Sequence, residues 1–246
     1  MNRYGIRGPI YKWFKSYLSG RLQFVSILGY DSNKQLITQG SVLGPLLFLI
    51  YINDLHNAIK YSETYLFADD TNLLSITNNQ NIMQREMNID LKNLWRWLLA
   101  NKIYLNKNKT ELIFFKKPHT IIPFNKIKIN GMQLYPSKSV KYLGIHLDEH
   151  LNGSAHADIL IPKLQRANGM LAKIRHYTPA KETKSIYHEI FARHMTYGCQ
   201  IWGQSFSNTH INKIQKLQNN ALRLITFAPN SRDHITPHNT TICRRS

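Results

Sequence analysis

The feature that most constrains the fold of this 246-residue chain is a change in hydrophobic periodicity near residue 152. Before that point, segments with apolar residues at helical spacing, such as 82–100, alternate with short β-prone runs, such as 64–68. Beyond it, only the helical spacing recurs. The pattern therefore predicts an α+β domain over residues 1–152, followed by an α-helical region over residues 153–228.

The expected elements follow from the spacing of the apolar residues. The predicted helices of the first region are 9–18, 43–59 and 82–100, and its predicted strands are 23–28, 64–68, 71–76, 111–115, 126–129 and 140–147. Three helical faces follow, marked by Leu160, Leu164, Ala167, Leu171 and Ile174, by Ile186, Ile190 and His194, and by Ile211, Ile214, Gln218, Ala221 and Ile225. Residues 229–246 form a polar, basic tail without this pattern, so we expect them to be disordered.

The chain is strongly basic along its whole length. Lysine and arginine number 32 against 14 aspartates and glutamates, which gives a formal net charge of +18. Residues 1–123 hold 15 basic and 8 acidic side chains, and residues 124–246 hold 17 and 6. An apolar fraction of 43% is enough for a core and excludes a wholly disordered basic chain. A folded chain with this charge is typical of proteins that bind polyanions, with nucleic acid first among them.

Two features argue against secretion and against a membrane partner. Only two cysteines occur, Cys199 and Cys243, which excludes the disulfide framework of small secreted proteins. The first residues lack the apolar region of a signal peptide, and the apolar run 42–52 is about half of the ~20 residues that a spanning helix needs. We therefore expect an intracellular protein, in the nucleus or the cytoplasm.

Asp69 and Asp70 lie between the two β-prone runs 64–68 and 71–76, at the spacing of a hairpin turn. On a regular strand, neighbouring side chains point to opposite faces, but a tight turn lets both carboxylates reach one cation. Hard ions such as Mg²⁺ prefer oxygen ligands, and two such ions about 3.5–4 Å apart can drive nucleotidyl transfer. An ordinary solvated turn is the alternative, because aspartate is a common turn residue.

The surrounding motifs resemble a known family. The sequence is similar to non-LTR (LINE-type) retrotransposon reverse transcriptases over about residues 4–228. The similarity is carried, in order, by 39–48 (QGSVLGPLLF), 51–55 (YINDL), 67–71 (FADDT), 105–111 (LNKNKTE), 141–145 (KYLGI), 197–203 (YGCQIWG) and 217–223 (LQNNALR). It implies a partial right-hand polymerase palm, with helices packed on an antiparallel sheet, followed by an α-helical thumb-like region.

The resemblance also implies a reaction, partners and site residues. The reaction is RNA-directed DNA polymerisation by a two-metal Mg²⁺ mechanism, with an RNA template, a DNA primer and deoxynucleotide triphosphates as partners. Asp69 and Asp70 are the implied catalytic residues and metal ligands. Nucleotide or template contacts are implied for Gln39, Gly40, Ser41 and Lys109, and primer contacts for Tyr142, Leu143 and Gly144. Without the resemblance, Gln39 and Gly40 also suit a cap or a turn, and Lys109 a solvated surface position.

One departure from the family pattern bears on activity. Family members take a third carboxylate from a strand upstream of the helix at 13–18, and the only acid before Gln39 is Asp31, which does not match. We therefore expect the chain to be part of a longer element and, by itself, to be inactive or weakly active. The alternatives are a non-catalytic nucleic-acid-binding remnant and an intron maturase-like protein, against which the 197–203 block argues.

Overall fold

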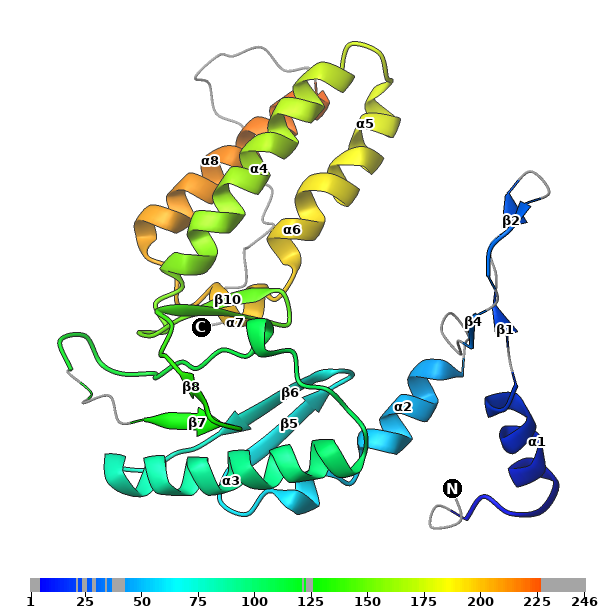
Figure 1. Ribbon diagram of the computed structural model, residues 1–246. Coiled ribbons are helices and arrows are strands. Elements are labelled where there is room, and N and C mark those ends of the chain that lie inside the picture. The colour runs from blue at the N-terminus through cyan, green and yellow to red at the C-terminus, as the bar shows by residue number, and fades with distance from the viewer. Residues whose placement is uncertain are drawn as a thin grey trace. The chain divides into compact units, whose positions relative to one another are not determined.

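The computed structural model of the chain describes residues 5–20, 22–23, 26–27, 30–33, 35–36, 43–120, 122 and 126–226. The chain divides into two compact units (Figure 1). The first comprises Met1–Tyr104 and Ile127–Gly131, and the second comprises Leu105–Lys126 and Met132–Ser246. Both contain helices together with short antiparallel strand pairs, which confirms the mixed α+β composition. The predicted domain limits at residues 152 and 228 stay predictions, and the predicted disordered tail lies outside the described residues.

The first unit begins with a helix and short strands and continues into a longer helix. Its elements are α1 (Gly8–Leu18), β1 (Leu22–Gln23), β2 (Ser26–Ile27), β3 (Tyr30–Asp31), β4 (Gln35–Leu36), α2 (Gly44–Ile52), the 3-10 helix η2 (Leu55–Ala58), β5 (Glu63–Phe67), β6 (Asp70–Leu74), α3 (Gln80–Ala100) and β7 (Ile127–Ile129). Strand β1 pairs with β4, β2 with β3, and β5 with β6, all antiparallel. The helices expected at 9–18 and 82–100 and the hairpin around Asp69 are thus confirmed.

Helix α3 supplies much of the core of the first unit. The side-chain oxygen of Asn79 caps its N-terminus by accepting the N–H groups of Asn81 at 3.0 Å and Ile82 at 3.2 Å. The apolar stripe expected from the sequence is buried and faces η2 and β7, through Met87, Leu91, Leu94 and Leu98. Burying each leucine contributes about 1.5–3 kcal/mol, so this face fixes the helix in place.

Asp90, on the same helix, is fully buried and fastens the segment that leads into β5. One carboxylate oxygen accepts the backbone N–H of Lys60 at 2.9 Å. The other accepts those of Tyr61 at 3.1 Å and Ser62 at 2.7 Å. A buried carboxyl group needs hydrogen-bond partners, and these three backbone donors supply them. The start of the β5–β6 hairpin is therefore held against α3.

The predicted helix 43–59 is wrong in its second half. Helix α2 ends at Ile52, and the chain continues past Asn53 and Asp54 into the separate 3-10 helix η2. Short polar side chains such as these compete for backbone hydrogen bonds and favour helix ends. The hydroxyl of Tyr51 in α2 donates to the backbone carbonyl of Asn101 just after α3. In the described part of the chain, no helix has both the length and the apolar composition needed to cross a bilayer.

The predicted strand 111–115 is also wrong. Leu112 forms only an isolated parallel bridge to Pro136, supported by the N–H of Ser137, which donates to the carbonyl of Leu112 at 2.7 Å. Proline has no N–H group, so it cannot donate a further ladder bond. A regular strand therefore does not grow from this bridge.

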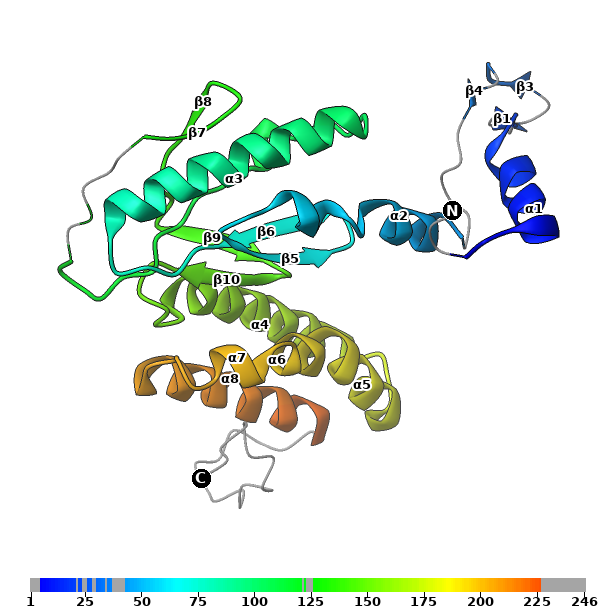
Figure 2. The ribbon, with the colours of Figure 1, turned by 90° about the horizontal axis from the view of Figure 1, so that it is seen from below.

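The second unit is mainly helical. Its elements are the 3-10 helix η3 (Lys107–Lys109), β8 (Met132–Leu134), β9 (Ser139–Tyr142), β10 (Ile145–Asp148), α4 (Ser154–Ile174), α5 (Ala180–Tyr187), the π-helix η4 (His188–Ala192), α6 (Arg193–Thr196), α7 (Cys199–Trp202) and α8 (Asn208–Thr226). Helices α4, α5 and α8 lie side by side and contact one another (Figure 2). The middle predicted helix is thus a run of α5, η4 and α6, in which the π-turn accommodates an extra residue.

The helical bundle encloses the core of the second unit. Leu164 and Leu171 of α4, Phe191 of η4 and Ala221 of α8 are fully buried. The buried amide of Asn168 in α4 crosses to α8 by donating to the backbone carbonyl of Leu217 at 2.9 Å. At the entrance to α4, the carboxylate of Asp148 accepts the N–H groups of His150, Asn152 and Gly153 at 2.9–3.1 Å. These contacts tie strand β10 to the bundle.

We expect the second unit to lose stability below about pH 6.5. The ring of His156 is buried against Trp202 and Phe206, and this burial, followed by the charges of His146 and Lys163, lowers its pKa. The unfolded chain therefore takes up the proton first as the pH falls. Stability is full above about pH 6.5 and declines toward the folded-state pKa. Urea unfolding at about pH 7.5 and about pH 5.5 measures the loss.

The variant His156→Asn keeps a hydrogen-bond acceptor near the backbone N–H of His146 but cannot titrate, so we expect a shallower pH dependence. A residual slope should remain, because burial also lowers the pKa of His146 and of His194. The matched control is His176→Asn at an exposed position. An unchanged slope in His156→Asn would contradict the assignment.

We expect Asp90→Asn to lower the free energy of unfolding by about 1–3 kcal/mol, because one acceptor oxygen is replaced by an amide donor that faces backbone N–H groups. Urea unfolding measures the loss, and hydrogen exchange of the amides of residues 60–62 should accelerate. Glu86→Gln is the control, since it neutralises a half-buried acid one turn earlier on α3. Equal losses in both variants would argue against a specific role for Asp90.

Candidate active site

The acidic pair lies at the tip of the β5–β6 hairpin. Phe67 pairs with Asp70, so Ala68 and Asp69 form the two-residue turn and Asp70 is the first residue of β6. The turn therefore lies one residue earlier than the Asp69–Asp70 turn expected from the sequence. Ala68 has a φ of +50°, in the left-handed region that side chains rarely adopt. Such strain persists only where the flanking pairs impose it, here the five-residue ladder from Glu63 to Phe67.

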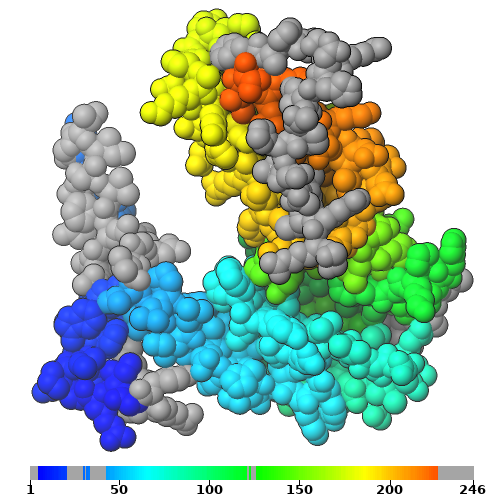
Figure 3. All heavy atoms as spheres, turned by 180° about the vertical axis from the view of Figure 1, so that it is seen from behind, coloured from blue at the N-terminus to red at the C-terminus, as the bar shows by residue number. Residues whose placement is uncertain are grey.

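The surface around the acidic pair is open and aromatic. Side chains of β5 alternate between exposed and half-buried, and the exposed set includes Tyr65 and Phe67, which are 49% and 61% exposed. The carboxylates of Asp69 and Asp70 are exposed as well. Atoms of this hairpin, coloured cyan, lie on the molecular face that Figure 3 shows. A large ligand can therefore reach both acids without any rearrangement of the hairpin.

The donor chemistry of the pair fits a hard divalent cation. Mg²⁺ is commonly held by one or two carboxylates, with water and substrate phosphates completing its octahedron. Asp69 and Asp70 supply two such groups. Among the described residues, no cluster of three or more His, Cys, Asp or Glu side chains is placed to hold a metal. A cation held by this pair would need substrate oxygens and water to complete its coordination.

Asp90 lies outside the exposed site but holds the hairpin that carries it, a role that sequence reasoning missed. Its backbone contacts fix the segment before β5, and β5 leads directly to the acidic turn. One signal was available: Asp90 follows Met87 by three residues and precedes Leu94 by four, so it occupies an apolar-stripe position of the predicted helix. A carboxylate on a buried face needs partners, and this one finds them in backbone N–H groups.

Lys109 lies in the second unit, at the end of the 3-10 helix η3. The side chain of Asn106 caps this turn by accepting the N–H of Asn108 at 3.1 Å, and its carbonyl accepts the hydroxyl of Thr110 at 2.9 Å. The side chain of Lys109 is exposed. An exposed ammonium group on a capped turn can contact a phosphate, as can most surface lysines.

Tyr142, Leu143 and Gly144 form the tip of the β9–β10 hairpin, also in the second unit. Tyr142 pairs with Ile145, and the two turn residues have φ values of +45° and +83°. Positive φ at both central positions is typical of the type I′ turn, whose twist matches that of the flanking strands. The single strand predicted over 140–147 is therefore wrong, because this turn divides it into β9 and β10. The role of these residues in primer binding stays a prediction.

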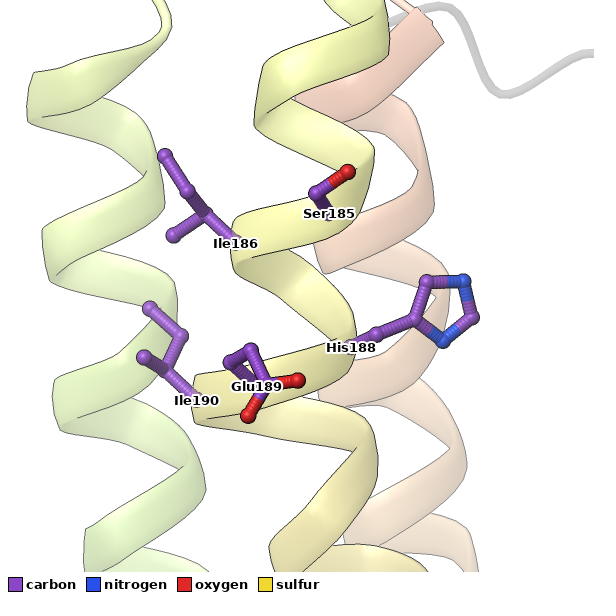
Figure 4. A pocket seen from close by; sticks show the side chains of 5 residues that line it. All are labelled: Ser185, Ile186, His188, Glu189 and Ile190. Atoms are coloured by element: carbon purple, nitrogen blue, oxygen red, sulfur yellow. The ribbon is translucent and has the colours of Figure 1, made fainter.

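The remaining predicted site residues, Gln39, Gly40 and Ser41, lie outside the described residues. The described site residues divide between the units, with the acidic pair in the first and Lys109 and the β9–β10 tip in the second. A separate depression of about 490 Å³ on the bundle is lined by Ser185, Ile186, His188, Glu189 and Ile190 (Figure 4). None of the predicted site residues lines it. Ile186 and Ile190 point toward α4 and pack against the core, whereas His188 points away from α4.

Comparison with known proteins agrees with the motifs. Residues 1–147 match the family described as reverse transcriptase (RNA-dependent DNA polymerase). No solved structure matches the chain significantly.

Curated relatives from Drosophila melanogaster cover most of the chain. A probable RNA-directed DNA polymerase from transposon BS is 31% identical in an alignment of 239 positions that covers 90% of this chain and 26% of the relative. A probable RNA-directed DNA polymerase from transposon X-element is 29% identical over 89% of this chain and 25% of its own length. The RNA-directed DNA polymerase from mobile element jockey is also 29% identical, with the same two coverages. The chain thus spans about a quarter of the length of these relatives.

The family match covers more than half of the chain and includes the acidic hairpin. The chain belongs to the reverse transcriptase (RNA-dependent DNA polymerase) family and is of the LINE-type, non-LTR retrotransposon kind.

Proposed function

We propose that the chain carries part of the active site of an RNA-directed DNA polymerase, which adds deoxynucleotides to a DNA primer on an RNA template. The observation that carries the proposal is the exposed Asp69–Asp70 pair at the tip of a two-stranded hairpin, in a chain of the reverse transcriptase family. The net charge of +18 supports a polyanionic partner.

In this proposal, Asp69 is the main Mg²⁺ ligand and Asp70 its partner. The bound ion supplies Lewis-acid stabilisation of phosphate oxygens and activation of the attacking hydroxyl. The exposed ammonium of Lys109 neutralises triphosphate charge. The tip formed by Tyr142, Leu143 and Gly144 contacts the primer. We assign Gln39, Gly40 and Ser41 to nucleotide or template contacts on the family resemblance alone.

The finer fold assignment is part of the same proposal. Residues 1–152 would correspond to a partial polymerase palm and residues 153–228 to a thumb-like helical region. The bundle of α4, α5 and α8 supports the second assignment, because it forms a helical body with its own core.

A second candidate function is non-catalytic binding of nucleic acid. The observation that favours it is the small donor set, since the described residues offer two adjacent carboxylates and no larger cluster around them. A two-metal mechanism requires ligands that bridge both ions. A chain with the acidic pair as its complete ligand set would still bind a primer–template but would not extend the primer.

The primer-extension test uses the full chain with an RNA template, a labelled DNA primer, deoxynucleotides and Mg²⁺ or Mn²⁺. We expect weak extension, and we expect Asp69→Asn to reduce it at least about 100-fold, since the variant loses a charged metal ligand. The matched control is Asp158→Asn, an exposed acid of the second unit, which should extend like the unaltered chain.

The outcomes of this assay distinguish catalytic from non-catalytic binding and test the assignment of Asp69 as a metal ligand. Extension that survives Asp69→Asn would contradict the assigned metal ligand. No extension above background, together with tight primer–template binding, would favour the non-catalytic candidate. Strong Asp69-dependent extension would overturn our expectation that the chain is weakly active by itself.

Binding of the primer–template should depend steeply on salt and little on the acidic pair. Each neutralised phosphate contributes about −0.9 to the slope of log K against log salt on a duplex, so several contacts give a slope of about −4 or steeper. We expect Asp69→Ala to leave the slope unchanged, because an aspartate does not contact phosphate directly. Fluorescence anisotropy across a salt series measures both quantities. A slope near zero would contradict a basic binding surface.

A further inference from the structure

A tyrosine from the 197–203 block touches the turn of the β9–β10 hairpin. The hydroxyl of Tyr197 donates to the backbone carbonyl of Leu143 at 2.6 Å, across 54 residues of sequence. Its ring also lies against the turn, because a Cβ placed on Gly144 would come within 3.2 Å of ring atom Cε1 and 3.4 Å of the hydroxyl. The tyrosine therefore bonds to the backbone of Leu143, and its ring occupies the space where a side chain at Gly144 would lie.

Tyr197 is itself anchored to the core of the second unit. Its backbone carbonyl accepts the indole N–H of Trp202 at 2.8 Å, and Trp202 is buried. The next residue, Gly198, has a φ of +61°, and a Cβ at that position would lie 2.5 Å from the Cδ1 atom of Ile145. Only glycine permits this approach of α7 to strand β10. The phenol thus extends from a fixed backbone to the tip of the hairpin.

The contact has little to do with core stability. Tyr197 is 56% exposed, and Gly144 is exposed as well. A hydrogen bond at such a position competes with water and contributes little to unfolding. Its effect is instead local, because it restrains a two-residue turn between two short strands.

We propose that Tyr197 is the positioning residue of the primer contact, holding the Leu143–Gly144 turn in the conformation that meets the primer. The inference rests on the proposed function, in which residues 142–144 touch the primer. It assigns a function to the 197–203 block, which resembles a family motif but had no function assigned from the sequence. The phenol acts through the turn, so the lost hydroxyl should weaken primer engagement without unfolding the unit.

The test compares Tyr197→Phe, which removes only the hydroxyl, with Tyr177→Phe, a matched change at an 88% exposed tyrosine of the same unit. We expect faster hydrogen exchange at the amides of Gly144 and Ile145, and a roughly three- to tenfold weaker Kd for the RNA–DNA primer–template in Tyr197→Phe. The urea midpoint should stay the same. Tyr177→Phe should match the unaltered chain in all three measurements.

A second variant approaches the same contact from the turn. Gly144→Ala places a methyl group on a backbone with a φ of +83° and against the Tyr197 ring, so it should weaken primer–template binding to a similar extent. Combined with Tyr197→Phe, it should add less than the sum of the separate losses, because both remove one contact. Full additivity would overturn the proposal.

The exchange measurement needs no nucleic acid, so it separates this inference from the proposed function. Unchanged exchange at the turn in Tyr197→Phe overturns the positioning role, whatever the binding result. Faster exchange with an unchanged Kd overturns the link between the turn and the primer. If the unaltered chain fails to bind a primer–template, the proposed function fails, and with it the claim that the turn is held for a primer.

Discussion

The first unit depends on one buried carboxylate. Asp90 accepts the N–H groups of three consecutive residues, and the chain must pass through that point before it enters β5. The apolar face of α3 fixes the helix, and the carboxylate transfers that fixed position to the hairpin. The exposed acids at the hairpin tip thus take their position from a buried acid that has no contact with solvent. The apolar packing of α3 positions the carboxylate of Asp90, and the hydrogen bonds of that carboxylate then position the start of β5.

In the second unit, too, a hairpin is held by a buried core, but the contacts that hold it are different. Its bundle buries apolar faces of α4, η4 and α8, and the tip of the β9–β10 hairpin is linked to that bundle through Trp202, Gly198 and Tyr197. In both units, a hairpin tip is held by an element that has its own buried core. This arrangement places functional groups at the surface without requiring them to contribute to stability.

Sequence periodicity predicted those elements that bury one face, such as α3, α4 and α8. It failed for the end of α2, where the short polar side chains of Asn53 and Asp54 favour a helix end. It also failed for residues 111–115, where Pro136 in the bridged segment cannot donate a ladder hydrogen bond. It gave no sign of the partners of Asp90, since backbone N–H groups occur at nearly every residue. The long-range contact of Tyr197 was likewise invisible to local pattern, and the roles of the predicted site residues stay predictions.

The π-helix η4 affects the direction in which the chain arrives at Tyr197. Each residue of an α-helix turns the chain by about 100° and advances it 1.5 Å, so one extra residue in His188–Ala192 rotates all that follows α5 by that amount. Without the insertion, Thr196 and the loop after it would leave the bundle in another direction. The π-turn thus helps to set the direction in which Tyr197, the residue after α6, leaves the bundle and meets the hairpin.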